Sequence, residues 1–220
     1  MKKTLSLMFA AVLTMQVATV ANAQAVAGNA DRGKDKVAMC IGCHGIPGYK
    51  ATFPEVYHVP KISGQNAKYI EAALKAYREG TRKHPSMRGI GGSLTDEDIA
   101  DVAAFYEASA KPSTTEVTVP TPSPQVASLL QKGACVSCHG ANFSKPIDGN
   151  TPKIAGQYAD YLYASLKAYR DDTHRTWGRG NPVMAGQAKQ FSDQELKALS
   201  KYLSTVPGDL ATVPEPRFIR

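Results

Sequence analysis

Apolar side chains recur every three or four residues in several stretches of this chain, which is the spacing of one face of a helix. The pattern is clearest in residues 69–77 and in residues 161–169. The two faces consist of Tyr69, Ile70, Ala73, Leu74 and Tyr77 in the first stretch and Tyr161, Leu162, Ser165, Leu166 and Tyr169 in the second. No stretch shows the alternation of a half-buried strand. The pattern predicts an all-α fold with long loops between the helices.

Two further helices are marked by capping signals at their N-termini. Thr95 with Asp98, and Ser192 with Glu195, match the capping box, in which two side chains satisfy backbone N–H groups where a helix begins. An amphipathic segment follows each box, with apolar positions at Ile99, Val102, Ala103 and Tyr106 and at Leu196, Leu199, Tyr202 and Leu203. A further helix is expected to lead into each of the two cysteine motifs described below.

The second half of the chain repeats the first. Residues 60–78 align with residues 152–170 at an offset of 92, and 13 of these 19 positions are identical. Farther along the chain the offset becomes 97, which pairs Met87 with Met184. A period this long indicates two copies of one domain, because the units of a solenoid are only about 20–50 residues long.

A proline-rich stretch separates the two copies. Residues 109–124 hold four prolines and many hydroxyl side chains, as is typical of an extended, semi-rigid linker. We therefore place domain 1 at residues 24–110, the linker at 111–121, and domain 2 with a C-terminal extension at 122–220. Each domain has roughly 90 residues, which is small for a free-standing core.

The first 23 residues have the features of a signal peptide. Lys2 and Lys3 precede an apolar stretch from Leu5 to Val20, and Ala21-Asn22-Ala23 matches a cleavage site of the A-x-A type. Polar residues interrupt the apolar stretch, which therefore lacks the run of about 18 apolar residues that a membrane anchor needs. We expect the segment to be removed on export, leaving 220 − 23 = 197 residues.

Composition and charge exclude some classes of function. The chain has 43% hydrophobic and 20% charged residues, which is typical of a folded protein rather than a disordered one. Its net charge of +7 falls to 24 − 19 = +5 when Lys2 and Lys3 are removed, and most of this excess lies after residue 110. The excess is too small and too dispersed for a nucleic-acid-binding protein, but it suits a weakly attractive docking face for an acidic partner.

All four cysteines belong to two copies of one motif, in which Cys40 and Cys43 precede His44, and Cys135 and Cys138 precede His139. This C-x-x-C-H sequence is the attachment signature of c-type haem, whose two vinyl groups bond to the thiols and whose iron binds the histidine. A zinc site would need cysteine pairs about 15–20 residues apart, whereas these begin 135 − 40 = 95 residues apart. A dithiol oxidoreductase would need a βαβ pattern, which the sequence lacks. The sequence predicts two covalently bound haem c groups.

The second axial ligand determines what each iron can do, because a thioether closes the position and raises the reduction potential, whereas an open position admits substrate. Met87 and Met184 occupy matching places just before the capped helices, in stretches with glycine and proline that we interpret as loops. We predict that they complete the coordination begun by His44 and His139. The remaining histidines do not align between the two copies and are expected in surface loops; they are His58, His84 and His174.

The C-x-x-C-H motif, the later P-x-I-x-G segment and the loop methionine of each half together resemble class I cytochrome c. Two such halves behind a signal peptide resemble the dihaem cytochrome c4 family of bacterial periplasms, over nearly the whole mature chain. The resemblance implies that the carbonyl groups of Pro60 and Pro152 accept the Nδ1 protons of His44 and His139. It also implies two domains related by a pseudo-twofold axis, with the haem propionates facing the junction between them.

Basic residues surround both predicted methionine ligands. Arg78 and Arg170 recur at matching positions, and we expect them to bind haem propionates or to belong to a docking ring; the alternative is a solvated loop balanced by nearby acidic residues. The same alternatives apply to Arg82, Lys83, Arg88, Arg175 and Arg179. Trp177 either covers a haem edge or fills its own loop.

Two segments depart from the family pattern. Residues 46–58 form a longer and more aromatic segment than their counterpart at 141–151, and residues 206–220 are an additional extension. Either segment could recruit a partner that other members of the family lack.

These features predict an electron-transfer protein rather than an enzyme. We expect a periplasmic monomer that passes single electrons between respiratory-chain donors and a terminal oxidase or reductase, with redox proteins such as membrane-bound respiratory complexes as partners. Neither nucleic acid nor a small-molecule substrate is expected. One alternative is the electron-accepting dihaem subunit of a flavin- or quinoprotein-type dehydrogenase. A dihaem enzyme, such as a peroxidase or a thiosulfate-oxidising type, would need an open or unusually ligated iron, which the paired methionines argue against.

Overall fold

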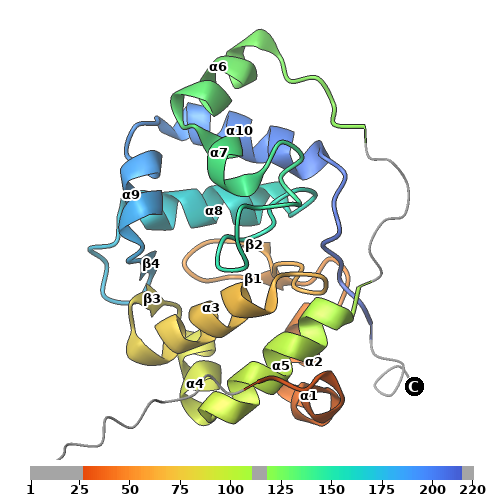
Figure 1. The fold of residues 1–220 in the computed structure, drawn as a ribbon. Coiled ribbons are helices and arrows are strands. Elements are labelled where there is room, and N and C mark those ends of the chain that lie inside the picture. Colours follow the sequence, from red (N-terminus) through yellow and green to blue (C-terminus); the bar gives the residue numbers. More distant parts are fainter. Residues whose placement is uncertain (1–26, 111–117, 215–220) are drawn as a thin grey trace, which may run out of the picture.

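A computed structural model describes residues 27–110 and 118–214. The predicted signal peptide at 1–23, most of the 111–121 linker and the end of the C-terminal extension lie outside these residues. Two helical domains follow one another along the chain (Figure 1). Domain 1 contains α1 (Ala30–Lys36), α2 (Ala38–His44), α3 (Ala67–Glu79), α4 (Pro85–Ser93) and α5 (Asp96–Ala108). Domain 2 contains α6 (Pro124–Lys132), α7 (Cys135–His139), α8 (Ala159–Arg170), α9 (Pro182–Ala188) and α10 (Asp193–Thr205).

Each domain has its own apolar core, built from the helix faces that the sequence pattern indicates. In domain 1, α5 packs against α1 and α3, and the core includes Ile70, Leu74 and Ile99. In domain 2, α10 packs against α8 and α6, and Leu162 and Leu196 hold the corresponding core positions. Both capping boxes form as predicted, with Thr95 and Asp98 starting α5 and Ser192 and Glu195 starting α10.

The all-α prediction is confirmed, and the described residues also contain four strands of two residues each. β1 (Lys50–Ala51) pairs with β2 (Tyr57–His58) inside the long 46–58 segment, whereas β3 (Arg82–Lys83) of domain 1 pairs with β4 (Gly178–Arg179) of domain 2. Strands of two residues are too short to produce an alternating pattern, which is why the sequence did not reveal them. The β3–β4 pair lies where the two domains meet (Figure 1).

The two segments that depart from the family pattern both contact the other domain. In the 46–58 segment, the carboxylate of Glu55 lies 2.6 Å from the Lys167 ammonium, and the His58 ring lies 2.6 Å from the Asp160 carboxylate. In the extension, Ala211 exchanges two backbone hydrogen bonds with Ser63 of domain 1, at 3.0 and 3.2 Å. Both segments therefore help to join the domains.

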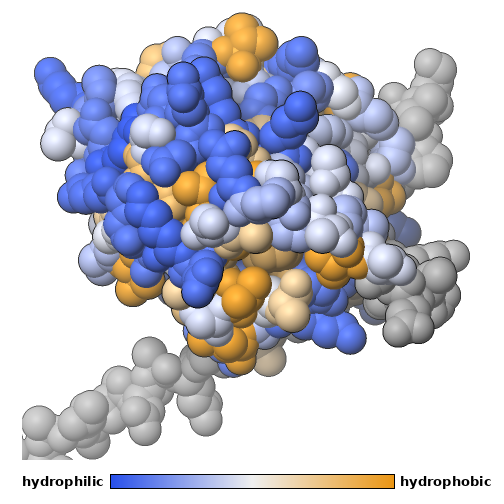
Figure 2. Space-filling model, turned by 90° about the horizontal axis from the view of Figure 1, so that it is seen from above, coloured by the Kyte–Doolittle hydropathy of each residue, from blue (hydrophilic) through white to orange (hydrophobic). Residues whose placement is uncertain are grey.

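Among residues 27–110 and 118–214, no helix combines the length and the apolar character that crossing a bilayer requires. Viewed from the side of α6, the surface is largely hydrophilic with separate apolar patches (Figure 2).

Candidate functional site

The two cysteine motifs lie on corresponding short helices, one in each domain. Cys40, Cys43 and His44 belong to α2, and Cys135, Cys138 and His139 make up most of α7. Residues three apart in a helix share a face, so the two thiols of each motif lie on the same side of the helix. None of these four cysteines forms a disulfide. Each helix therefore offers two thiols and an adjacent imidazole to a single haem.

Each motif histidine is oriented by a proline carbonyl of its own domain. Nδ1 of His44 lies 2.9 Å from the carbonyl oxygen of Pro60, and Nδ1 of His139 lies 2.9 Å from that of Pro152. A carbonyl oxygen only accepts, so Nδ1 carries the proton and Nε2 keeps a free lone pair. Burial lowers the pKa of both histidines, which keeps them neutral. A neutral imidazole with a free Nε2 is the form that binds iron.

Met87 and Met184 lie on short helices, α4 and α9, rather than in the loops that we expected. Each helix begins with proline, which is favoured at the first helical position because its missing N–H would be unpaired there anyway. The preceding residue caps the helix by accepting the methionine's own backbone N–H: His84 Nδ1 accepts from Met87 at 3.4 Å, and Asn181 Oδ1 accepts from Met184 at 3.0 Å. Proline and glycine concealed these helices in the sequence.

The competing histidines have other partners. His84 caps α4 and lies edge-on to the Phe53 ring, with 6.3 Å between the ring centroids. His174 stacks on Trp177 with 4.0 Å between centroids, and its Nε2 lies 3.4 Å from the Asp171 carboxylate. His58 binds Asp160, as described above. Trp177 is thus engaged within its own loop.

Arg78 and Arg170 make the same contacts in the two domains. Arg78 donates to the Leu94 carbonyl at 3.3 Å and to the Asp96 carboxylate at 2.6 Å. Arg170 donates to the Phe191 carbonyl at 3.3 Å and to the Asp193 carboxylate at 2.5 Å. Both arginines therefore tie the stretch after the methionine helix to the start of the last helix. A contact between either arginine and a propionate remains a prediction.

A different pair of arginines, Arg82 and Arg179, meets at the junction between the domains. Both donate to the phenolic oxygen of Tyr161, at 3.1 and 3.0 Å, and Arg82 also donates to Tyr69 at 3.0 Å. The guanidinium of Arg82 lies over the Tyr77 ring. Burial raises the pKa of Tyr161, but the charges of Arg179 and Arg82 outweigh burial and lower it to about 8.

Within the part of the chain that the structure describes, no carboxylate forms an ion pair with Arg82 or Arg179. None of the ion pairs among the described residues includes either guanidinium, and the buried Nε of Arg82 has no hydrogen-bond partner. Arginine binds carboxylates through its planar fork of donors. Two such cations at the junction fit the carboxylates of haem propionates. The repeat pairs Arg82 with Arg179 at an offset of 97, but Arg78 and Arg170 also recur, so the sequence did not distinguish the pair at the junction from the other basic residues.

Comparisons with known proteins agree with this geometry. The family model for cytochrome c matches residues 30–108 and again residues 125–207. The chain is 30% identical to cytochrome c4 of Stutzerimonas stutzeri over 207 residues, which cover 87% of this chain and 94% of that protein. The chain belongs to the cytochrome c4 family. The crystal structure of reduced cytochrome c4 from Pseudomonas stutzeri matches this cytochrome c4-family chain with a TM-score of 0.62 and 28% identity, over 82% of this chain and 100% of that one.

Another relative of this cytochrome c4-family chain has a more specific name. The thiosulfate dehydrogenase electron acceptor of Stutzerimonas stutzeri strain A1501 is 32% identical over 183 residues, which cover 79% of this chain and 82% of that protein. Membership of the family confirms two tandem cytochrome c domains and two covalently bound haem c groups at Cys40, Cys43, Cys135 and Cys138. The chain is a dihaem electron-transfer protein with redox proteins as partners.

Proposed function

We propose that this chain is a periplasmic carrier that passes single electrons between respiratory-chain donors and a terminal oxidase or reductase. His44 and Met87 bind one iron in this proposal, and His139 and Met184 bind the other. Each haem supplies an iron that alternates between the ferric and ferrous states. A histidine and a methionine of the chain occupy both axial positions of each iron, which leaves no position for substrate. Residues 1–23 direct export, and the carrier acts as a monomer.

The observation that carries this proposal is the matched placement of Met87 and Met184. Each methionine lies in the first turn of a short helix whose cap binds the methionine's own N–H. Methionine often fills irregular gaps in a core, but two repeat-equivalent gaps with the same cap geometry would be an unusual coincidence. Methionine at both irons favours a carrier over a dihaem enzyme.

The test replaces each methionine with alanine. In the ferric protein we expect a far-red thioether-to-iron band with contributions from both haems. Met87→Ala should remove about half of the band and lower the potential of that haem, because thioether sulfur favours ferrous iron. Met184→Ala should do the same for the other haem. Both variants should also bind carbon monoxide at the opened position.

The outcome that contradicts the proposal is equally specific. Either methionine fails as a ligand if its alanine variant keeps the full band. His174→Ala serves as a control, because it removes a nearby histidine that does not cap a methionine helix and should leave the whole far-red band unchanged. A haem that lacks the far-red band in the unsubstituted protein, and that binds carbon monoxide only in a histidine variant, would instead favour histidine as the second ligand.

A second candidate function is the electron-accepting subunit of a dehydrogenase. It is favoured by the relative named thiosulfate dehydrogenase electron acceptor and by a match to thiosulfate dehydrogenase TsdBA of Marichromatium purpuratum, with a TM-score of 0.55 and 27% identity. The match covers 76% of this chain and 36% of that one. Purification from the native host separates the two functions: a free carrier elutes at the mass of one chain, whereas a subunit elutes with a dehydrogenase.

A further inference from the structure

Two glutamines, Gln65 and Gln157, join the domains by a reciprocal set of hydrogen bonds. The side chain of Gln157, in domain 2, binds the backbone of Lys61 in domain 1: Oε1 accepts from the Lys61 N–H at 3.0 Å, and Nε2 donates to the Lys61 carbonyl at 2.8 Å. The side chain of Gln65, in domain 1, binds the backbone of Lys153 in the same way, with both distances at 2.9 Å. Each glutamine binds the equivalent lysine of the other domain, so these hydrogen bonds follow the pseudo-twofold relation between the two domains.

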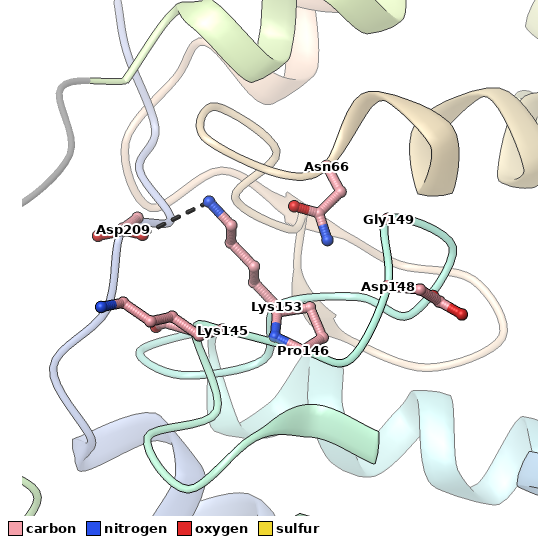
Figure 3. A pocket seen from close by; sticks show the side chains of 8 residues that line it. Asn66, Lys145, Pro146, Asp148, Gly149, Lys153 and Asp209 are labelled. Atoms are coloured by element: carbon pink, nitrogen blue, oxygen red, sulfur yellow. Dashed lines mark hydrogen bonds and ion pairs between the residues drawn. The ribbon is translucent and has the colours of Figure 1, made fainter.

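These hydrogen bonds are buried, and two lysine side chains form further bonds across the junction. Gln65 is 5% exposed and Gln157 is 4% exposed, so water competes little for their amide groups. The two lysine side chains also reach across the junction, where Lys61 Nζ donates to the Gly156 carbonyl at 2.7 Å and Lys153 Nζ donates to the Gly64 carbonyl at 2.8 Å. Lys153 lines a pocket together with Asn66 and Asp209 (Figure 3).

Each glutamine binds a peptide group that already holds a haem-ligating histidine. The peptide between Pro60 and Lys61 accepts the Nδ1 proton of His44 at its carbonyl oxygen and donates its N–H to Gln157. The peptide between Pro152 and Lys153 likewise accepts from His139 and donates to Gln65. The C=O and N–H of one peptide are electronically linked, because resonance delocalises the bond between them.

We infer that Gln157 adjusts the reduction potential of the haem held by His44, and that Gln65 adjusts the potential of the haem held by His139. Each glutamine is thus a positioning residue for the iron of the other domain. The inference rests on the proposed roles of His44 and His139 as iron ligands. It extends the proposed function, because hydrogen bonds at the junction between the domains then influence the reduction potentials of both haems.

The direction of the effect follows from hydrogen-bond cooperativity. A peptide whose N–H donates to an acceptor carries more negative charge on its carbonyl oxygen, because bonds in a chain polarise one another. A stronger acceptor at Nδ1 makes the imidazole a more basic ligand. A more basic ligand stabilises ferric iron and lowers the potential. Removing the amide of Gln157 should therefore raise the potential of the domain 1 haem.

The experiment uses the full holoprotein with Gln157→Leu and Gln65→Leu, which keep most of the side-chain volume and remove the amide. Redox titration should show one of the two waves shifted upward in each variant, and a different wave in each. The shifts in Met87→Ala and Met184→Ala assign the waves to haems. Gln157→Leu should move the wave that Met87→Ala moves, and Gln65→Leu should move the other.

A matched control separates this effect from a weakened junction. Asn66 Nδ2 also donates across the junction, to the Thr151 carbonyl at 2.9 Å, but it does not touch either histidine-binding peptide. Asn66→Ala should leave both waves in place. Unshifted waves in both glutamine variants, or shifts of the glutamine's own domain haem, would overturn the inference.

A second measurement keeps the test decisive if a leucine variant does not accumulate. Gln157→Asn and Gln65→Asn shorten the side chain by one methylene and should lengthen the same bonds. The Nδ1 proton resonance of the histidine in the opposite domain, identified by ¹⁵N-histidine labelling, should then move toward that of a weaker hydrogen bond. No movement would count against the inference. The far-red band of the unsubstituted protein and its loss in the methionine variants test the proposed function separately.

Discussion

Asp101 is a buried carboxylate of domain 1 that has no equivalent in domain 2. Its side chain has no exposed surface, and it accepts hydrogen bonds from Arg32 at 2.8 Å, from Lys36 at 2.9 Å and from the backbone N–H of Asn29 at 2.7 Å. These bonds join α1 to α5. The position that the offset of 97 assigns in domain 2 is Ala198, so only domain 1 depends on a charge at this place.

We expect Asp101→Asn to destabilise domain 1 by about 2 kcal/mol, since charge-assisted hydrogen bonds contribute about 1.5–3 kcal/mol each and the exposed parts of both cations recover some hydration. Urea unfolding of the holoprotein measures the loss. Asp35→Asn removes one exposed carboxylate from α1 and should change the free energy of unfolding little. Equal losses in the two variants would mean that net charge, rather than the buried network, stabilises the domain.

The same carboxylate makes domain 1 sensitive to acid. Hydrogen bonds from Arg32 hold the pKa of Asp101 well below its usual range, against the opposing effect of burial. A group with a lowered folded-state pKa contributes full stability above its unfolded value of about 4 and loses it as the pH falls through the folded value. Below pH 4 the unsubstituted protein should therefore lose stability faster than Asp101→Asn. Thermal unfolding at several pH values checks this; parallel curves would contradict it.

At the scale of elements, the methionine helices α4 and α9 depend on different caps. Asn181 is a favoured cap residue and accepts from Met184 at 3.0 Å, whereas His84 accepts from Met87 at the longer distance of 3.4 Å. Substituting an asparagine cap by alanine costs about 1 kcal/mol. Asn181→Ala should therefore loosen α9 and, with Met184 as the proposed ligand, open the domain 2 iron at a lower temperature.

The far-red band followed during heating measures this opening. In Asn181→Ala we expect the domain 2 part of the band to disappear several degrees earlier, while the domain 1 part keeps its midpoint. Asn181→Asp retains a good cap acceptor and should behave as the unsubstituted chain does. An unchanged midpoint in Asn181→Ala would show that α9 is held by packing alone.

Some helices were predicted correctly from the sequence and others were not. The helices α3, α5, α8 and α10 were predicted because each carries a continuous apolar face, and two of them carry a capping box as well. The helices α4 and α9 are short and contain proline and glycine, so the sequence predicts loops at both places. Their caps became visible only once His84 and Asn181 were placed against the backbone of the methionines.

At the scale of the whole molecule, the number of haems and the start of the mature chain are predicted together. The intact mass of the exported protein should correspond to residues 24–220 with two haems bonded to the four cysteines. Both motifs should be loaded, because each has its own proline and its own methionine. A mass with one haem, or with the first 23 residues retained, would contradict the dihaem or the export prediction respectively. Cys138→Ala, which leaves a single thiol in the second motif, provides the control for a weakened attachment.

The amino-acid sequence by itself determined the chemistry of each domain. The cysteine spacing indicated the covalent cofactor, the repeat indicated two copies, and the caps and apolar faces indicated the main helices. The cysteine spacing, the caps and the apolar faces are local, since each involves residues within a few turns of one another, and the repeat is the recurrence of such local patterns. Such local patterns can be recognised in the sequence however the two domains are arranged.

Only the tertiary structure decided how the two domains meet. The bonds of Gln65 to Lys153 and of Gln157 to Lys61, the bond of Arg82 to Tyr161, and the pairing of β3 with β4 all join residues about 80–100 positions apart. Glutamine, arginine and tyrosine occur on ordinary surfaces, and their spacing within one domain says nothing about what lies opposite. The partner of each side chain depends on the packing of one whole domain against the other, and no local pattern encodes that.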